Sequence, residues 1–137
     1  MMNVVLDTST LIACFAKRSP YRPIFDALLS GKYLLSVSTD ILLEYAEKIE
    51  QKTTPTISHN VLELLSNLGN VQTQNVYFFW NLIPHDPDDN KFTDCYVAAG
   101  ADYLVSNDRH FNALLPTDFP PVQVISIEDF LIIVQRM

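Results

Sequence analysis

The chain has 137 residues, of which 48% are hydrophobic and 18% are charged. This length and composition exclude a disordered chain and predict one globular domain covering residues 1–137. The formal net charge of −7 argues against a protein that binds nucleic acid through a broad basic face, because such faces neutralise phosphates with Lys and Arg.

The cysteines and the apolar runs indicate the cellular compartment of the protein. Cys14 and Cys95 lie far apart in apolar stretches without a CxxC pattern, which predicts reduced, buried thiols and no zinc site. The N-terminal stretch meets an acid too early for a signal peptide, and no run reaches the roughly 20 apolar residues of a membrane span. We therefore expect a cytoplasmic protein with no membrane partner.

The first half of the chain alternates short apolar runs with amphipathic stretches. A β-prone run stops at Asp7, and the polar residues that follow it lead into an apolar helical stretch. Further on, Ser38 and its neighbours are candidate helix caps before a stretch with one apolar face. The elements predicted here are a strand at 3–6, helices at 11–17 and 23–30, a strand at 33–37, and helices at 41–52 and 61–68.

The second half continues the alternation. Its aromatic block Tyr77 to Trp80 lies within an apolar run that we interpret as a strand, with the rings in the core or at a subunit interface rather than stacked on bases. The elements predicted here are a strand at 76–83, a turn at 85–90, a helix at 92–100, a strand at 102–106, a helix at 107–115, a strand at 122–126 and a helix at 127–137. This order predicts an α/β fold, with a central parallel sheet between two helical layers.

Two acids follow predicted strands. Asp7 ends the first strand, and Asp108 follows the strand at 102–106 with Asn107 between. In parallel α/β sheets, ligands bind beyond the carboxyl ends of the strands. Two carboxylates at one sheet edge repel each other unless a cation lies between them. The alternative is that each acid caps the helix that follows it.

Two further acids complete the candidate set. Glu44 lies early in the helix at 41–52, where it could instead form an i,i+4 pair with Lys48. Asp94 lies near the start of the helix at 92–100, where the helix dipole mildly favours an acid. Separated carboxylates without His or Cys suit Mg²⁺, and one or two such ions would support phosphodiester hydrolysis.

Four segments together resemble the PIN domain, and most of all the PIN-type toxins of bacterial toxin–antitoxin pairs. They are VVLDTSTLI, SVSTDILLEY, DPDDNKFTDCYVAAGADYLVSNDRHF and IEDFL. The resemblance spans residues 3 to about 131, and the run from Asp86 to Phe111 is its most specific part. It implies a three-layer α/β/α domain with Mg²⁺- or Mn²⁺-dependent endoribonuclease activity on single-stranded RNA.

Residue roles follow from the same resemblance. It implies that Asp7, Glu44, Asp94 and Asp108 bind the metal and are catalytic, with Asp89 competing with Asp94 for the third role. It also implies that three polar residues orient ligands or water: Thr8, Ser9 and Asn107. The spacing of Asp94 before Val97-Ala98-Ala99 favours Asp94 over Asp89.

The remaining expectations concern partners and alternatives. The clustered cations Lys17, Arg18 and Arg22 are weak candidates for RNA contacts, and we expect an antitoxin partner and a homodimer. A non-catalytic PIN-like binding module is one alternative. An aspartyl-phosphate phosphotransferase using Asp7 is a less favoured one, because that chemistry needs an acid where Ser9 stands.

Overall fold

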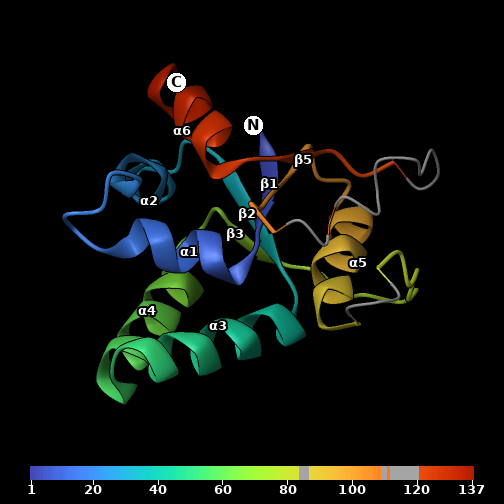
Figure 1. Ribbon diagram of the computed structural model, residues 1–137, viewed down its shortest axis with the longest axis horizontal. Coiled ribbons are helices and arrows are strands. Elements are labelled where there is room, and N and C mark those ends of the chain that lie inside the picture. The colour runs from blue at the N-terminus through green and yellow to red at the C-terminus, as the bar shows by residue number, and fades with distance from the viewer. Residues whose placement is uncertain (84–86, 109–110, 112–120) are drawn as a thin grey trace.

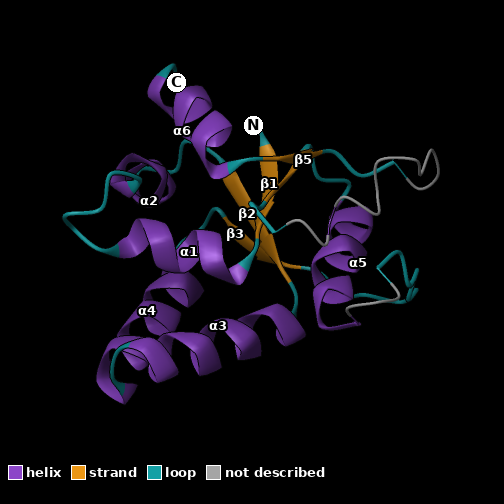
Figure 2. Cartoon of the chain, viewed as in Figure 1, coloured by secondary structure: helices purple, strands orange, loops and turns teal. Residues whose placement is uncertain are grey.

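Five parallel strands form the centre of the structure, a computed structural model that describes residues 1–83, 87–108, 111 and 121–137. Across the sheet the strand order is β3-β2-β1-β4-β5, and every neighbouring pair is parallel (Figure 2). The strands are β1 (Asn3–Leu6), β2 (Leu34–Val37), β3 (Val71–Thr73), β4 (Tyr103–Val105) and β5 (Val124–Ile125). Strand order reverses at β1, so the carboxyl ends of β1 and β4 meet at the edge where a ligand site is expected.

Helices cover both faces of the sheet. Figure 1 shows α1 (Thr8–Phe15), α2 (Arg22–Leu29) and α6 (Ile127–Gln135) on one side and α5 (Asn90–Ala99) on the other. The helices α3 (Thr39–Lys52) and α4 (Pro55–Asn67) pack against each other, and a 3-10 turn η1 (Pro87–Asp89) precedes α5. The predicted three-layer α/β/α architecture is confirmed. None of the helices in the described ranges is both long and apolar enough to cross a membrane.

Local chemistry sets the helix starts. The Asp7 carboxylate accepts a hydrogen bond from the Thr10 backbone N–H at 2.8 Å, so Asp7 caps α1. Ser38 caps α3 in the same way, and Thr54 caps α4 just before Pro55. At the other end of α5, Gly100 adopts a left-handed conformation with φ of 61°, which a residue with a Cβ adopts only with strain.

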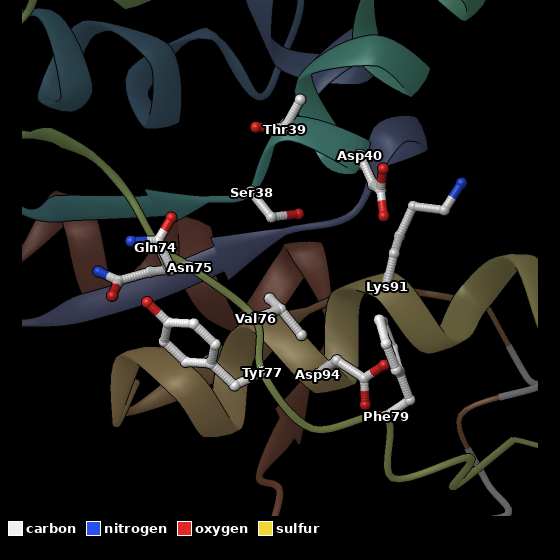
Figure 3. A pocket seen from close by; sticks show the side chains of 10 residues that line it. All are labelled: Ser38, Thr39, Asp40, Gln74, Asn75, Val76, Tyr77, Phe79, Lys91 and Asp94. Carbon is white, nitrogen blue, oxygen red and sulfur yellow. The ribbon is translucent and has the colours of Figure 1, made fainter.

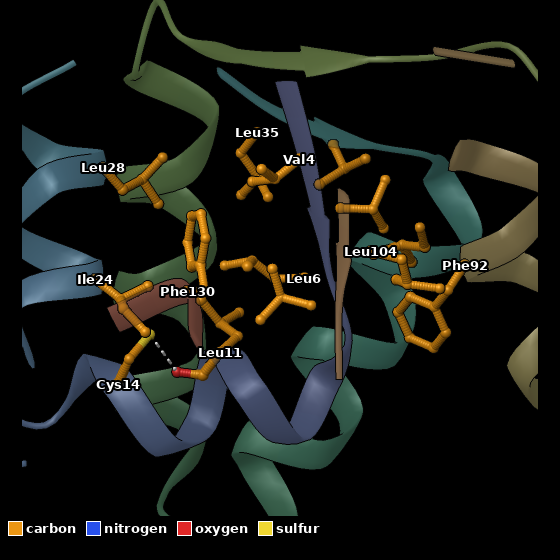
Figure 4. Close-up of a cluster of buried hydrophobic side chains, with 14 of the residues drawn as sticks. Val4, Leu6, Leu11, Cys14, Ile24, Leu28, Leu35, Phe92, Leu104 and Phe130 are labelled. Atoms are coloured by element: carbon orange, nitrogen blue, oxygen red, sulfur yellow. Dashed lines mark hydrogen bonds between the residues drawn. The ribbon is translucent and has the colours of Figure 1, made fainter. Parts of the chain in front are cut away.

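The core lies on both faces of β1. Figure 4 shows Ile24 and Phe130 on one side of the sheet and Phe92 of α5 on the other. The Phe130 ring packs edge-on against Tyr33, with 5.2 Å between ring centroids. Because the central strands are covered twice, they are apolar throughout rather than alternating, as the sequence of β1 shows.

The strand predicted at 76–83 is wrong. The third strand is Val71–Thr73, which occupies the outer edge of β2, and the chain then continues as a loop from residue 74 to 83. Tyr77, Phe78 and Phe79 are 81%, 73% and 79% exposed, so the expectation of a core position is also wrong for them. The predicted helix at 107–115 and turn at 85–90 lie partly outside the described residues. The helix predicted at 61–68 begins earlier, at Pro55.

Candidate active site

A cavity of about 280 Å³ opens at the carboxyl edge of the sheet. Its wall combines five acids with two lysines, two hydroxyl residues and two apolar side chains. These residues are Asp7, Thr8, Ser9, Ile12, Glu44, Lys48, Lys52, Asp88, Asp89, Phe92 and Asp108. Segments far apart in the sequence therefore contribute carboxylates to one cavity.

Asp7 is the most buried acid of this cavity, with 5% of its surface exposed. One carboxylate oxygen accepts hydrogen bonds from the Thr10 backbone N–H at 2.8 Å and the Ser9 hydroxyl at 3.2 Å, and the other accepts from the Ser106 hydroxyl. Burial raises the pKa of Asp7 above its usual value, while the hydrogen bonds from Ser106, Thr10 and Ser9 act in the opposite direction. Asp7 is thus both a helix cap and a cavity residue.

Glu44 reaches the cavity from the second turn of α3. One of its oxygens accepts from the Thr8 hydroxyl, and the other lies 2.9 Å from the Lys91 ammonium. Both members of this ion pair are mostly buried, with side-chain exposures of 21% for Lys91 and 16% for Glu44. The partner of Glu44 in the described structure is therefore Lys91 of α5 rather than Lys48 of its own helix.

Asp108 lies next to Asp7 through Ser106. The Ser106 hydroxyl, which donates to Asp7, also accepts from the Asp108 backbone N–H at 3.0 Å. Asn107 faces away toward α6, where its amide donates to Glu128 and its carbonyl accepts from the Ile127 N–H at 2.9 Å. Asn107 does not line the cavity, and its contacts fix the start of α6. Any helix that Asp108 would cap begins outside the described residues.

The structure separates the two competing acids of the predicted site. Asp89, at the end of η1, lines the cavity together with Asp7, Glu44 and Asp108. Asp94 projects from α5 into a different cavity, which also contains residues of the loop from 74 to 83 (Figure 3). There its carboxylate accepts a hydrogen bond from the Trp80 backbone N–H at 2.9 Å. Burial raises the pKa of Asp94, and the hydrogen bond from Trp80 partly opposes this.

The donor chemistry of the acidic cavity fits a hard divalent ion, because its ligating atoms are carboxylate and hydroxyl oxygens. Among the described residues, no three acidic, histidine or cysteine side chains are arranged so that all could hold one ion. Lys91, Thr8 and Ser106 already contact oxygens of Glu44 and Asp7. The arrangement suits an ion that keeps several waters and takes one or two carboxylates, which is the usual binding of Mg²⁺.

Sequence reasoning missed several residues that line the cavity or contact its acids. Ser106 follows β4 as Asp7 follows β1, so its position at a strand end was the available sign. Lys48 and Lys52 lie four and eight residues after Glu44, which places all three on one helix face. Lys91 is 47 residues from Glu44, and no local pattern indicates that pair.

Comparison with known proteins places this architecture in a family. A family model for the PIN domain matches residues 3–110, which is most of the chain and includes every acid of the cavity. The chain belongs to the PIN domain family. Comparison with curated protein sequences gives no significant match.

Solved structures share the fold of this PIN domain. A chain of VapBC2 from Rickettsia felis, bound to a DNA fragment from their promoter, aligns with a TM-score of 0.62 and 14% identity, covering 91% of this chain and 98% of that one. DNA-bound VapBC from Salmonella typhimurium gives 0.61 and 16%, covering 93% and 99%. A protein from Pyrobaculum aerophilum gives 0.66 and 13%, covering 99% and 97%. At these identities the likeness establishes the fold.

Proposed function

We propose that this PIN domain is a divalent-metal-dependent endoribonuclease that cleaves single-stranded RNA in the cytoplasm as the toxin of a toxin–antitoxin pair. The observation that carries the proposal is the single cavity that gathers Asp7, Glu44, Asp89 and Asp108 at the carboxyl edge of the sheet. Membership of the PIN domain family supports a nuclease. The oxygen-only ligand set supports Mg²⁺ or Mn²⁺.

In this proposal one or two of the four acids would bind the metal directly, the other acids would bind the waters that the ion keeps, and neighbouring hydroxyl and backbone groups fix the carboxylates. Thr10, Ser9 and Ser106 orient the Asp7 carboxylate through hydrogen bonds, and Thr8 orients Glu44. When bound, the ion would activate a water and stabilise the charge that develops on the phosphodiester. The role of the protein is to fix the carboxylates before substrate arrives.

The geometry favours Asp89 over Asp94 as the third acid. Asp89 shares a cavity with the other three, whereas Asp94 holds the backbone of Trp80. The metal-binding role predicted for Asp94 from the spacing of its helix stays a prediction. A paired substitution tests it, because Asp94→Asn preserves an oxygen that can accept from Trp80 and Asp89→Asn changes the same functional group five residues earlier.

The experiment is a cleavage assay on end-labelled single-stranded RNA, using protein separated from any partner. We expect cleavage with Mg²⁺ or Mn²⁺, none in EDTA, and recovery when the ion is restored. Asp7→Asn should abolish cleavage, and Asp89→Asn should reduce it more than Asp94→Asn. Cleavage that persists in EDTA or in Asp7→Asn would refute the mechanism, and a larger loss in Asp94→Asn would return the third role to that residue.

One observation favours the alternative of a non-catalytic binding module. The Lys91 ammonium pairs with Glu44 at 2.9 Å and so already neutralises one candidate ligand. Electron paramagnetic resonance of Mn²⁺ added to the protein separates the two functions. Bound Mn²⁺ without cleavage of any RNA would identify a binding module, whereas phosphate retained covalently on Asp7 would identify a phosphotransferase.

The proposed partners are an antitoxin and a second copy of the chain. The VapBC structures of similar fold motivate the antitoxin. The exposed rings of Tyr77, Phe78 and Phe79 offer an apolar surface of the kind that subunit interfaces bury. Co-expression with the adjacent open reading frame should suppress toxicity and yield a complex. Sedimentation should show a dimer that Phe78→Ser and Phe79→Ser weaken, and a monomeric wild type would exclude the homodimer.

A further inference from the structure

The acidic cavity requires a local source of positive charge if it is to accept RNA. The chain carries a formal net charge of −7, and five acids line this cavity. A polyanion is repelled by such a surface unless cations stand at the cavity itself, because nucleic-acid affinity depends largely on neutralised phosphates. A bound divalent ion offsets only part of the negative charge.

The cations predicted from sequence do not provide that charge at the cavity. Arg22 pairs with Asp26 at 2.8 Å, donates to the Phe15 carbonyl at 2.6 Å and lies 5.0 Å from the centre of the Phe25 ring. These contacts fasten the start of α2 to the end of α1. Lys17 and Arg18 are exposed after the end of α1, and neither lines the cavity.

Two lysines of α3 do line the cavity. Lys48 is half-buried and Lys52 is exposed, and both follow Glu44 on the same face of the helix. Within the described part of the chain, neither forms a salt bridge, whereas Lys91 is held by Glu44. Both lysines therefore place a positive charge at the wall of the acidic cavity that no described carboxylate pairs with.

We propose that Lys48 and Lys52 bind two consecutive phosphates of the RNA strand on one side of the scissile bond. This inference rests on the proposed function. The rise of an α-helix separates residues four apart by about 6 Å along its axis, a spacing comparable to that of consecutive phosphates in an extended strand. Helix α3 begins just after β2 and runs past α1 (Figure 1), and Lys52 lies about one helical turn farther along it than Lys48. The strand is thereby directed along α3.

The test compares variants that remove the same charge at different places. The double variant Lys48→Ala/Lys52→Ala removes two charges from the cavity, and Lys32→Ala/Arg136→Ala removes two exposed charges elsewhere. We expect the cavity variant to raise KM with kcat little changed. In a plot of log affinity against log salt concentration, the slope for this variant should be shallower than the wild-type slope by about 1.4. Raising the salt from roughly 50 to 200 mM should therefore weaken RNA binding by the variant about sevenfold less than binding by the wild type. The distant variant should leave KM and the salt slope as in the wild type.

Substrate length gives a second measurement, which a general charge effect would not reproduce. Oligonucleotides are shortened one nucleotide at a time, in one series from the 5′ end and in another from the 3′ end. In one of the two series the affinity should fall in two steps, one for each lost phosphate contact, and in the other series these two steps should be absent. The two steps should disappear in Lys48→Ala/Lys52→Ala and persist in Lys48→Arg/Lys52→Arg, which retains the charge. If the double alanine variant does not fold, the single variants Lys48→Gln and Lys52→Gln replace it, each expected to remove one step.

The outcomes separate this inference from the proposed function. Unchanged KM, salt slope and length profile in the cavity variant would overturn the role of the lysines while leaving metal-dependent cleavage intact. A larger effect of Lys17→Ala/Arg18→Ala would overturn it in favour of the sequence-predicted patch. If the wild type cleaves no RNA, fluorescence anisotropy with the same oligonucleotides measures the lysine contribution directly. Equal binding by wild type and cavity variant would then refute the inference.

Discussion

Tyr45 connects the stability of the fold to the geometry of the acidic cavity. Its ring is fully buried, and its hydroxyl donates to the Leu6 carbonyl at 2.5 Å. Leu6 immediately precedes Asp7, and Tyr45 immediately follows Glu44. One hydrogen bond thus ties the end of β1 to the helix that carries the second acid.

Replacing Tyr45 with Phe should destabilise the protein by about 2 kcal/mol. The change removes the hydroxyl donor and leaves the buried Leu6 carbonyl without this partner, which costs about 1–3 kcal/mol. For a chain of this size, 2 kcal/mol corresponds to a fall in Tm of about 6–10 °C. Urea and thermal unfolding followed by circular dichroism measure both quantities. Cleavage should also need a higher Mg²⁺ concentration, because Asp7 and Glu44 lose a common anchor.

Tyr33→Phe is the matched control. The Tyr33 hydroxyl is also buried and donates to the Ile24 carbonyl at 2.9 Å, but Tyr33 lies before β2, at the sheet edge opposite the cavity. We expect a similar loss of about 1–3 kcal/mol and no change in metal requirement. If Tyr45→Phe unfolds at the wild-type urea concentration, the hydrogen bond does not contribute as argued. If both variants change the metal requirement equally, the effect is one of general stability.

Three further predictions follow from buried or strained groups. Burial raises the pKa of Asp7, so ionisation of Asp7 destabilises the metal-free fold at pH above that pKa, and the penalty shrinks as pH falls from there to the ordinary value of 3.8. In EDTA, Asp7→Asn should therefore raise Tm at neutral pH by an amount that shrinks toward acid pH, and a constant difference would contradict this cause. Gly100→Ala should cost about 1 kcal/mol in urea unfolding, because its φ is 61° and an added Cβ meets no atom within 4 Å, so an unchanged midpoint would exclude backbone strain. Cys14 and Cys95 are buried and their pKa values are raised to about 12, so iodoacetamide should label them only under denaturing conditions.

The parts of the fold that could be predicted are those with a local cause. The strand at 3–6 is a short apolar run that ends at a capping acid, and β1 has those bounds. The helix at 23–30 is bounded by Pro23 and Gly31, and α2 lies within one residue of it. Alternation of such elements sufficed to predict the parallel sheet with helices on both faces, because parallel strands need crossovers that cover them.

The failures have long-range causes. The run at 76–83 has the composition of a strand, but the edge of β2 is already paired with Val71–Thr73. Whether Asp89 or Asp94 takes the third role stays a prediction, because helical periodicity alone leaves open which side of α5 faces Asp7. Lys91 reaches Glu44 from another helix, so a local i,i+4 rule pointed to Lys48 instead.

The contact between Ser106 and Asp7 also bears on when the cavity can form during synthesis of the chain. It joins Asp7 to the end of β4 across 99 residues of sequence. A ribosome that has added Asp7 needs roughly 5–20 s to reach Ser106 at ordinary bacterial and eukaryotic rates. Throughout that interval the emerging chain carries Asp7 and later Glu44 without the strand that positions them. The complete cavity therefore forms only after β4 has been made, and a chain broken off before β4 lacks both Ser106 and Asp108.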